Sequence, residues 1–392
     1  MTRESKTLRV LLLGASGVFG SRLARLICAE DKPIDLTLAA RGLSKLSALA
    51  QGLSRPVKSL ALDRASLTAQ DLAGFDLVID AAGPFQASHM RVVESAMAAG
   101  VDYMDLADGR DFVQAFTRYD EAAKGAGMAL TAGASSIPAL SHAVIDHITQ
   151  GWSAIDTLRI GIYPGNRAPR GLAVVEGILS YVGRPVRVFR KGRWRDVPGW
   201  GLLHREKLPG VGKRWASVCE TPEQDLLVER YAPRRSAEFY AGLELGLLHL
   251  GLALMALPVR WGWVESLRPF SRPMLTIAKW FLPFGSDRGG MSVYASGEDE
   301  HGRSLARRWF LKANANRGPY VPVLAAMAML RRYRAGWRPD PGARVCSGFL
   351  SLADFEADFA RLGIEHCTFE EGREPRRDGR DAPLALPQTA WQ

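Results

Sequence analysis

The sequence predicts an α/β fold built on a doubly wound parallel sheet, and three observations favour it. Residues 8–13 are apolar at five of six positions, which is typical of a buried parallel strand. Three glycines follow directly, and residues 19–27 then place apolar side chains at helical spacing. From there to about residue 148, strand-like and helix-like segments alternate, which indicates parallel strands joined by helices.

The glycines at positions 14, 17 and 20 lie between the first strand and the first helix, the context in which such a turn binds a dinucleotide in a Rossmann domain. A backbone without Cβ atoms lets a diphosphate approach closely, and the start of the helix offers N–H groups and the positive end of its dipole. The residues expected to contact the cofactor here are Gly14, Ala15, Ser16, Gly17, Val18, Phe19 and Gly20.

The second strand, expected over 34–40, is followed by Arg41 and has no carboxylate at its end. An Asp or Glu near this position binds the ribose hydroxyl of NAD, whereas an Arg accommodates the 2′-phosphate of NADP. Because Ser44 and Lys45 follow Arg41 closely, the sequence favours NADP over NAD. The alternative is that Arg41 only caps a solvent-facing turn.

Ligands of such sheets bind beyond the carboxyl ends of the strands. Asp63, at the end of the third strand, either contacts the adenine ring or forms a turn. Segments 105–108 and 134–138 follow later strands and are expected to line the same cleft. The residues after the fourth strand complete the expected cofactor contacts: Ala82, Gly83, Pro84 and Phe85.

Several motifs in this region resemble the saccharopine dehydrogenase-like oxidoreductase family. Residues 83–85 match the family's G-P-[FY] turn, and residues 99–106 match its A-G-x-x-Y-x-D-L strand. Residues 133–138 resemble its G-x-x-S-x-P loop at the domain junction. The match is dense over about residues 7–148 and thin afterwards.

The resemblance implies an NADP-binding Rossmann domain, with a second α/β domain inserted before a C-terminal segment that returns to the first. It does not imply saccharopine as substrate, because the matching motifs belong to the cofactor site and the scaffold. The expected bounds are 1–140 for the Rossmann domain, 141–316 for the second domain, 317–369 for the returning segment and 370–392 for a disordered, Pro-rich tail.

Other enzyme classes lack their characteristic residues here. Short-chain dehydrogenases use Tyr-x-x-x-Lys, and no tyrosine of this sequence has a lysine four residues on. Acylating semialdehyde dehydrogenases need a cysteine at the domain junction, where this chain has Ser135 and Ser136. His142 and His147 are five residues apart, off the helical spacing for two ligands on one face, so no metal is expected.

Composition limits the partners and the location of the chain. The net charge of +10 comes without a basic helix or an RNA-binding motif, so no nucleic acid is expected. The excess positive charge lies either on ordinary solvated surface or on a surface that faces anionic phospholipid or an acidic substrate. Four scattered cysteines and a short polar start predict a cytoplasmic protein with reduced thiols.

Residues 239–284 form an unusual apolar insert. Residues 243–258 are nearly continuous Leu, Ala and Gly, and tryptophans follow among Arg and Lys. The run is short for a transmembrane span, and its composition fits a helical hairpin in the interface of a membrane, with peripheral attachment to the inner face. The alternative is a buried helix pair that lines an apolar substrate tunnel or a homodimer interface. Leu247 and Leu252 are expected to make the membrane contact.

The sequence therefore predicts an NADP-dependent oxidoreductase that transfers hydride to or from an unidentified small or lipid-like substrate in the interdomain cleft. The candidates for the proton donor are Tyr103, Asp105 and His89. A scaffold role for Tyr103 or Asp105, and a capping role for His89, are the alternatives. Because no clear acid–base pair is present, a second hypothesis is a membrane-associated NADP-binding protein with weak or lost catalysis.

Overall fold

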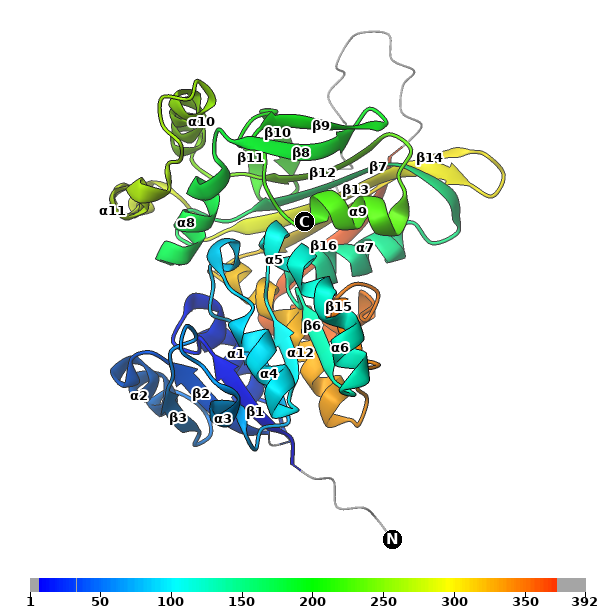
Figure 1. Cartoon of the computed structure of the whole chain (residues 1–392). Coiled ribbons are helices and arrows are strands. Elements are labelled where there is room, and N and C mark those ends of the chain that lie inside the picture. The colour runs from blue at the N-terminus through cyan, green and yellow to red at the C-terminus, as the bar shows by residue number, and fades with distance from the viewer. Residues whose placement is uncertain (1–6, 33, 372–392) are drawn as a thin grey trace, which may run out of the picture. The chain divides into compact units, whose positions relative to one another are not determined.

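A computed structural model describes residues 7–32 and 34–371, and the chain forms two compact units. The first unit comprises the residues up to 142, together with 169–177 and 319–355. The second comprises 143–168, 178–318 and the residues from 356 onward. The chain thus leaves the first unit and returns to it (Figure 1), which confirms the predicted α/β class with an inserted second domain.

The first unit is built on a sheet of seven parallel strands: β1 (Arg9–Leu13), β2 (Asp35–Ala40), β3 (Lys58–Ala61), β4 (Leu77–Asp80), β5 (Asp102–Asp105), β6 (Ala129–Ala132) and β15 (Gly342–Val345). Their order in the sheet is β15-β6-β5-β4-β1-β2-β3. The path from β3 to β6 is the doubly wound order in which the strand sequence reverses at β1. The point of reversal therefore lies between β1 and β4, directly beyond the glycine turn.

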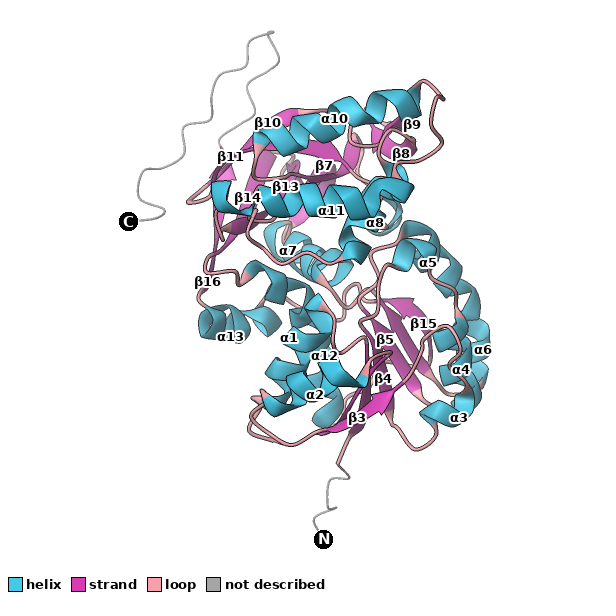
Figure 2. Cartoon of the chain, turned by 90° about the vertical axis from the view of Figure 1, so that its left-hand side faces the viewer, coloured by secondary structure: helices cyan, strands magenta, loops and turns pink. Residues whose placement is uncertain are grey.

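Helices cover both faces of this sheet. Figure 2 shows α1 (Val18–Cys28), α2 (Leu43–Gln51) and α12 (Val321–Arg334) on one side. The other side carries α3 (Ala69–Leu72), α4 (Arg91–Ala99), α5 (Arg110–Phe116) and α6 (Asp120–Gly125). Because helices cover both faces, β1 and β4 are apolar along most of their length, and all their residues except Arg9 are buried.

The second unit is built on a mixed sheet of nine strands: β7 (Trp152–Tyr163), β8 (Pro185–Arg190), β9 (Arg193–Pro198), β10 (His204–Leu208), β11 (Gly212–Val218), β12 (Ser236–Ala241), β13 (Gly289–Asp299), β14 (Ser304–Ala313) and β16 (Ile364–Glu371). The main path is β10-β11-β12-β7-β13-β14-β16, and the hairpin of β8 and β9 pairs with β12. Only β12 and β7 pair in parallel among the described strands of this sheet.

The remaining helices are α7 (Ser141–Ile148), α8 (Leu172–Tyr181), α9 (Glu223–Tyr231), α10 (Gly246–Arg260), α11 (Ser271–Trp280) and α13 (Ala353–Leu362). The apolar insert contains α10 and α11. Within residues 7–32 and 34–371, no helix has both the length and the apolar character to cross a bilayer.

The C-terminal part differs from the expected division in one respect. Residues 319–355 lie with the first unit and supply α12 and β15 to it. The chain then goes back to the second unit, where β16 pairs with β14 in antiparallel register. Apart from residues 370 and 371, the expected disordered tail lies outside the described part of the chain.

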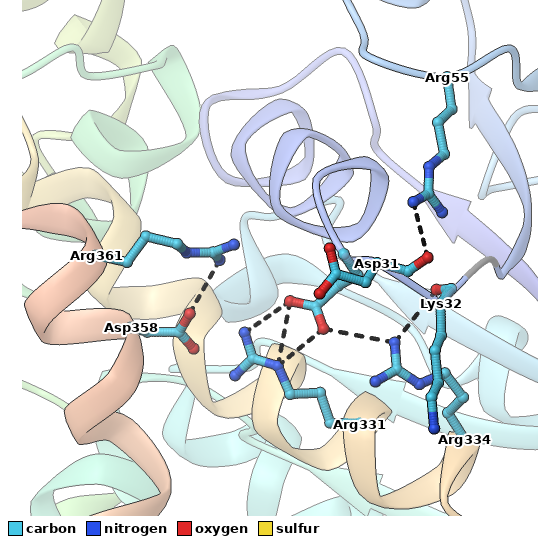
Figure 3. A network of polar contacts seen from close by, with 8 residues as sticks. Asp31, Lys32, Arg55, Arg331, Arg334, Asp358 and Arg361 are labelled. Carbon is cyan, nitrogen blue, oxygen red and sulfur yellow. Dashed lines mark hydrogen bonds and ion pairs between the residues drawn. The ribbon is translucent and has the colours of Figure 1, made fainter.

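A cluster of charges joins the segment after α1 to α12 within the first unit. Arg331 donates from Nη2 to Glu30 Oε1 at 2.9 Å, and Arg334 Nη1 lies 3.4 Å from Glu30 Oε2. Figure 3 shows Arg331 and Arg334 projecting from α12 toward the segment that follows α1. The Glu30 side chain is only 11% exposed, so this carboxylate is held by two guanidinium groups with little access to water.

We expect Glu30→Ala to lower the free energy of unfolding by about 1–3 kcal/mol, because two partly buried guanidinium groups then lose their counter-charge. Urea unfolding measures the effect. Glu121→Ala is the matched control, since that carboxylate is 88% exposed and pairs with Lys124 within one helix turn. Equal stability of the two variants would contradict a structural role for the cluster.

Candidate functional site

The carboxyl edge of the first sheet gathers the segments that the sequence places in one cleft. Parallel pairing of β2, β1, β4, β5 and β6 brings the residues after each strand to the same edge. The glycine turn follows β1, Arg41 follows β2, and residues 82–85 follow β4. The structure therefore brings these predicted residues to one edge, whereas it places Tyr103 within strand β5 itself.

The glycine turn has the backbone geometry that its sequence requires. Gly14 has a φ of +70°, and a Cβ atom there would lie 2.8 Å from the Ala82 backbone. A Cβ atom on Gly20 would meet the carbonyl oxygen of Gly14. Gly17 is exposed at the tip of the turn, and its N–H donates to the Gly14 carbonyl at 2.9 Å. The turn thus presents backbone rather than side chains.

The amino end of α1 lies directly after this turn. The helix begins at Val18 with Gly17 as its N-cap residue, and no side chain caps it. Its first turn contains no acidic residue. The N–H groups of a helix start and the positive end of its dipole attract anions, so the turn and α1 together suit a diphosphate. Ala15 is buried, and its N–H donates to the Ala39 carbonyl at 3.1 Å.

Three exposed polar residues surround the start of α2, a helix that the sequence did not reveal. Arg41 precedes it, and Ser44 and Lys45 lie in its first turn. The N-cap residue is Gly42, no side chain caps the helix, and its first turn has no acidic residue. Two cations, a hydroxyl and a helix amino end within five residues form a surface suited to a phosphate group.

Asp63 takes part in a turn. Its Oδ1 accepts the N–H of Ala65 at 3.0 Å, and its carbonyl accepts the N–H of Ser66 at 3.1 Å. This is the local bonding by which Asp stabilises a turn, and the side chain is exposed. The geometry favours the turn over the adenine contact.

Arg64 is a site residue that sequence reasoning missed. Its Nε lies 2.7 Å from Oδ2 of Asp80, the last residue of β4, which has no exposed surface. Its Nη1 donates to the Ala82 carbonyl at 2.9 Å, and its guanidinium lies 4.9 Å from the centre of the Phe85 ring. Burial raises the pKa of Asp80, and the charge of Arg64 opposes that rise.

This arrangement fixes the loop after β4. The N–H of Ala82 donates to Asp80 Oδ1 at 2.9 Å, and Phe85 is buried edge-to-face against Phe112. Gly83 is exposed, while Ala82 and Pro84 are partly exposed. Since Arg64 and Asp80 bond the carbonyl and the N–H of Ala82, they hold this residue against Gly14 of the glycine turn. A buried Asp at the end of an apolar strand was the signal that a cation must lie nearby.

Tyr103 and Asp105 form a second buried group. The Tyr103 hydroxyl donates to Asp105 Oδ2 at 2.9 Å, and the N–H groups of Ala107 and Gly133 donate to Oδ1 at 2.9 and 2.7 Å. Neither side chain has any exposed surface. Burial raises the pKa of Asp105 to about 7, although these hydrogen bonds oppose the rise, and it raises the pKa of Tyr103 well above its ordinary value.

These contacts favour a positioning role for both residues. Asp105 joins the end of β5 to the loop after β6, where Gly133 has a φ of +74° and packs on Pro138. His89 is the exposed member of the three proton-donor candidates and lies in the loop before α4. His142 is buried, with its Nδ1 2.6 Å from Ser347 Oγ, and no metal-binding group of His, Cys, Asp or Glu occurs in the described residues.

A segment from the middle of the chain also contributes to the first unit. Residues 169–177 belong to it, and they include the start of α8. A Cβ atom on Gly177 would lie 3.1 Å from Gln86 Oε1, and one on Gly171 would lie 3.9 Å from Val18. Gln86 in turn donates to Asp108 Oδ1 at 3.1 Å. The segment therefore passes close to both the glycine turn and the loop after β4, which no local sequence pattern indicated.

Comparison with known families agrees with this geometry. Residues 10–144 match the family described as "Saccharopine dehydrogenase NADP binding domain", which confirms the resemblance seen in the sequence. No curated protein matches the chain.

Solved structures share its fold, and two of them are described here by their similarity to the chain. The chain is similar to saccharopine dehydrogenase (L-Glu forming) from Saccharomyces cerevisiae, with a TM-score of 0.68 and 15% identity over 93% of this chain and 100% of that chain. It is also similar to a homospermidine synthase from Legionella pneumophila in complex with NAD, with a TM-score of 0.61 and 12% identity over 97% and 96% of the two chains. At such identities the similarity shows the fold alone.

We expect Asp105→Asn to flatten the pH dependence of stability. A raised pKa in the folded state means that the unfolded carboxyl ionises first, so the stabilising contribution is present below about pH 4 and is lost as pH rises to about 7. The loss is on the order of 2–4 kcal/mol for the wild type. Asparagine keeps the acceptor for both N–H groups and can donate to Tyr103, so the variant should fold.

Urea unfolding at a series of pH values measures this, with Asp111→Asn, at an exposed position of α5, as the control. Parallel stability profiles for the wild type and Asp105→Asn would contradict the assignment.

Proposed function

Since residues 10–144 match the family described as "Saccharopine dehydrogenase NADP binding domain", we propose that this chain is an NADP-dependent oxidoreductase acting on a small or lipid-like substrate. The observation that carries the proposal is the glycine turn at the uncapped start of α1, where bare backbone meets the positive end of a helix. When bound, the cofactor supplies or accepts the hydride. The residues of the chain bind and orient it.

The preference for NADP rests on the surface beyond β2. Arg41, Ser44 and Lys45 are exposed around the start of α2, and no carboxylate lies at the end of β2 to receive a ribose hydroxyl. An arginine and a lysine beside a helix start favour the additional phosphate of NADP. The Asp63 side chain already accepts a hydrogen bond within a turn, so Asp63 has the least support among the proposed cofactor contacts.

The proposed acid–base chemistry rests on His89. In the interior, Tyr103 donates a hydrogen bond to Asp105, and Asp105 also accepts two backbone N–H groups. We therefore assign these two residues to positioning the loops that face the cofactor. His89 is exposed in the loop between β4 and α4, where a substrate can reach its imidazole. The substrate site between the two domains stays a prediction.

The second candidate is an NADP-binding protein whose catalysis is weak or lost and which attaches to a membrane. The burial of two of the three proton-donor candidates favours it. Oxidation of NADPH in the presence of imines or unsaturated lipids separates the two candidates. Turnover supports the oxidoreductase, and tight binding of NADPH without any turnover supports the second candidate.

We expect Arg41→Ala to weaken NADPH binding by about 1–3 kcal/mol, the range for a lost charge-assisted hydrogen bond, and to leave NADH binding almost unchanged. Titration followed by nicotinamide fluorescence measures both affinities. Arg118→Ala is the matched control, since Arg118 is also an exposed arginine and lies in the connection between α5 and α6. If Arg41→Ala weakened NADPH and NADH equally, the assignment of the 2′-phosphate to Arg41 would be wrong.

A further inference from the structure

Apolar side chains gather on the outside of α10, α11 and their connections. Six Leu, Ile, Val, Phe or Trp side chains in the described part of the chain are more than half exposed, and all six lie within residues 247–284. We call these six residues the apolar surface: Leu247, Leu254, Trp261, Trp263, Trp280 and Phe284. Soluble surfaces rarely concentrate large apolar side chains in this way unless they bind something.

Helix α10 is apolar on two sides. Leu247, Leu254 and Trp261 are seven residues apart and therefore share one face, which is 56–70% exposed. The opposite side contains Leu252, which is only 5% exposed, and the buried His249. The sequence-based expectation that Leu252 contacts a membrane is therefore wrong, because this residue packs into the core of the second unit. The outward face of α10, in contrast, does not pack into this core.

Polar contacts fix the insert at both of its ends. Glu244, just before α10, accepts the N–H groups of Asn166 at 2.6 Å and Ser286 at 2.8 Å, and Arg214 donates to it at 3.0 Å. The Asn166 side chain donates to the Phe281 carbonyl at 2.6 Å. Glu244 near the start of the insert and Phe281 near its end are thus both bonded to Asn166 of the second unit, which anchors α10 and α11 to that unit.

The charges around the apolar surface are almost all positive. Between residues 246 and 284 the sequence has one acidic residue, Glu265, and four basic residues, all of them exposed: Arg260, Arg268, Arg272 and Lys279. Trp261 and Trp263 pack against each other with ring centres 5.0 Å apart. Tryptophan and basic residues beside exposed leucines are the composition of helices that lie in the interface of a membrane.

We propose that the apolar surface docks on an anionic phospholipid bilayer, with α10 and α11 lying along its plane. The leucines and aromatic rings enter the boundary between headgroups and acyl chains, and the four cations contact lipid phosphates. A second copy of the chain suits this surface less well, since a symmetric contact would bring the same basic residues face to face. The inference goes beyond the proposed oxidoreductase activity and does not depend on it, and it names the surface and the lipid class that the membrane attachment of the second candidate would use.

Flotation of the full chain with vesicles tests the proposal. We expect binding to phosphatidylcholine vesicles that contain phosphatidylglycerol, and weaker binding to phosphatidylcholine alone. Leu254→Ser combined with Trp280→Ser should lower the partition coefficient at least about tenfold, because two exposed apolar side chains are lost from the contact. Arg272→Gln and Lys279→Gln should each lower it about fivefold on anionic vesicles alone.

Leu203→Ser is the matched control, since Leu203 is 44% exposed in the same unit but outside the apolar surface. Circular dichroism of each variant shows that it is folded. The proposal is overturned if the wild type does not float, or if the Leu254→Ser/Trp280→Ser variant floats as well as Leu203→Ser. It is equally overturned if the wild type is a dimer in solution that the double variant converts to monomer, which would assign the surface to a second copy.

Discussion

The close packing of the Gly14 backbone on Ala82 is the constraint on which the site depends. A Cβ atom at Gly14 would lie 2.8 Å from this neighbouring backbone, so only glycine allows β1 and β4 to continue into turns that touch. Gly20 adds the same requirement between the start of α1 and the turn. Together they place the amino end of α1 at the carboxyl edge of the sheet, where its N–H groups can meet an anion.

Two buried carboxylates then hold the loops around this turn. Asp80 and Asp105 are each the last residue of a parallel strand, and each accepts one N–H group from the loop that follows. Arg64 forms an ion pair with Asp80, and the Tyr103 hydroxyl and the N–H of Gly133 donate hydrogen bonds to Asp105. The carboxyl edge of the sheet therefore presents backbone and exposed cations, and its two buried carboxylates position the loops. This suits an enzyme in which the cofactor supplies the chemistry and the protein supplies orientation.

The sequence was most informative where structure is local. The strand before Gly14, the turn and α1 follow one another without interruption, so their pattern predicts the observed elements closely. Arg64 was missed because its partner Asp80 is distant in sequence, and residues 169–177 were missed because only the fold brings them beside Gln86. The two sides of α10 could not be assigned, since both are apolar, and only the structure separates Leu252 from Leu254.

Titration of the purified chain with NADPH, in the wild type and in Gly17→Ala, tests whether the glycine turn binds the diphosphate of the cofactor. Gly17 is exposed at the tip of the turn, where a diphosphate would approach the backbone. We expect saturable binding by the wild type and an affinity at least about tenfold lower in a folded Gly17→Ala variant. No binding by the wild type, or equal affinity in the two proteins, would contradict it.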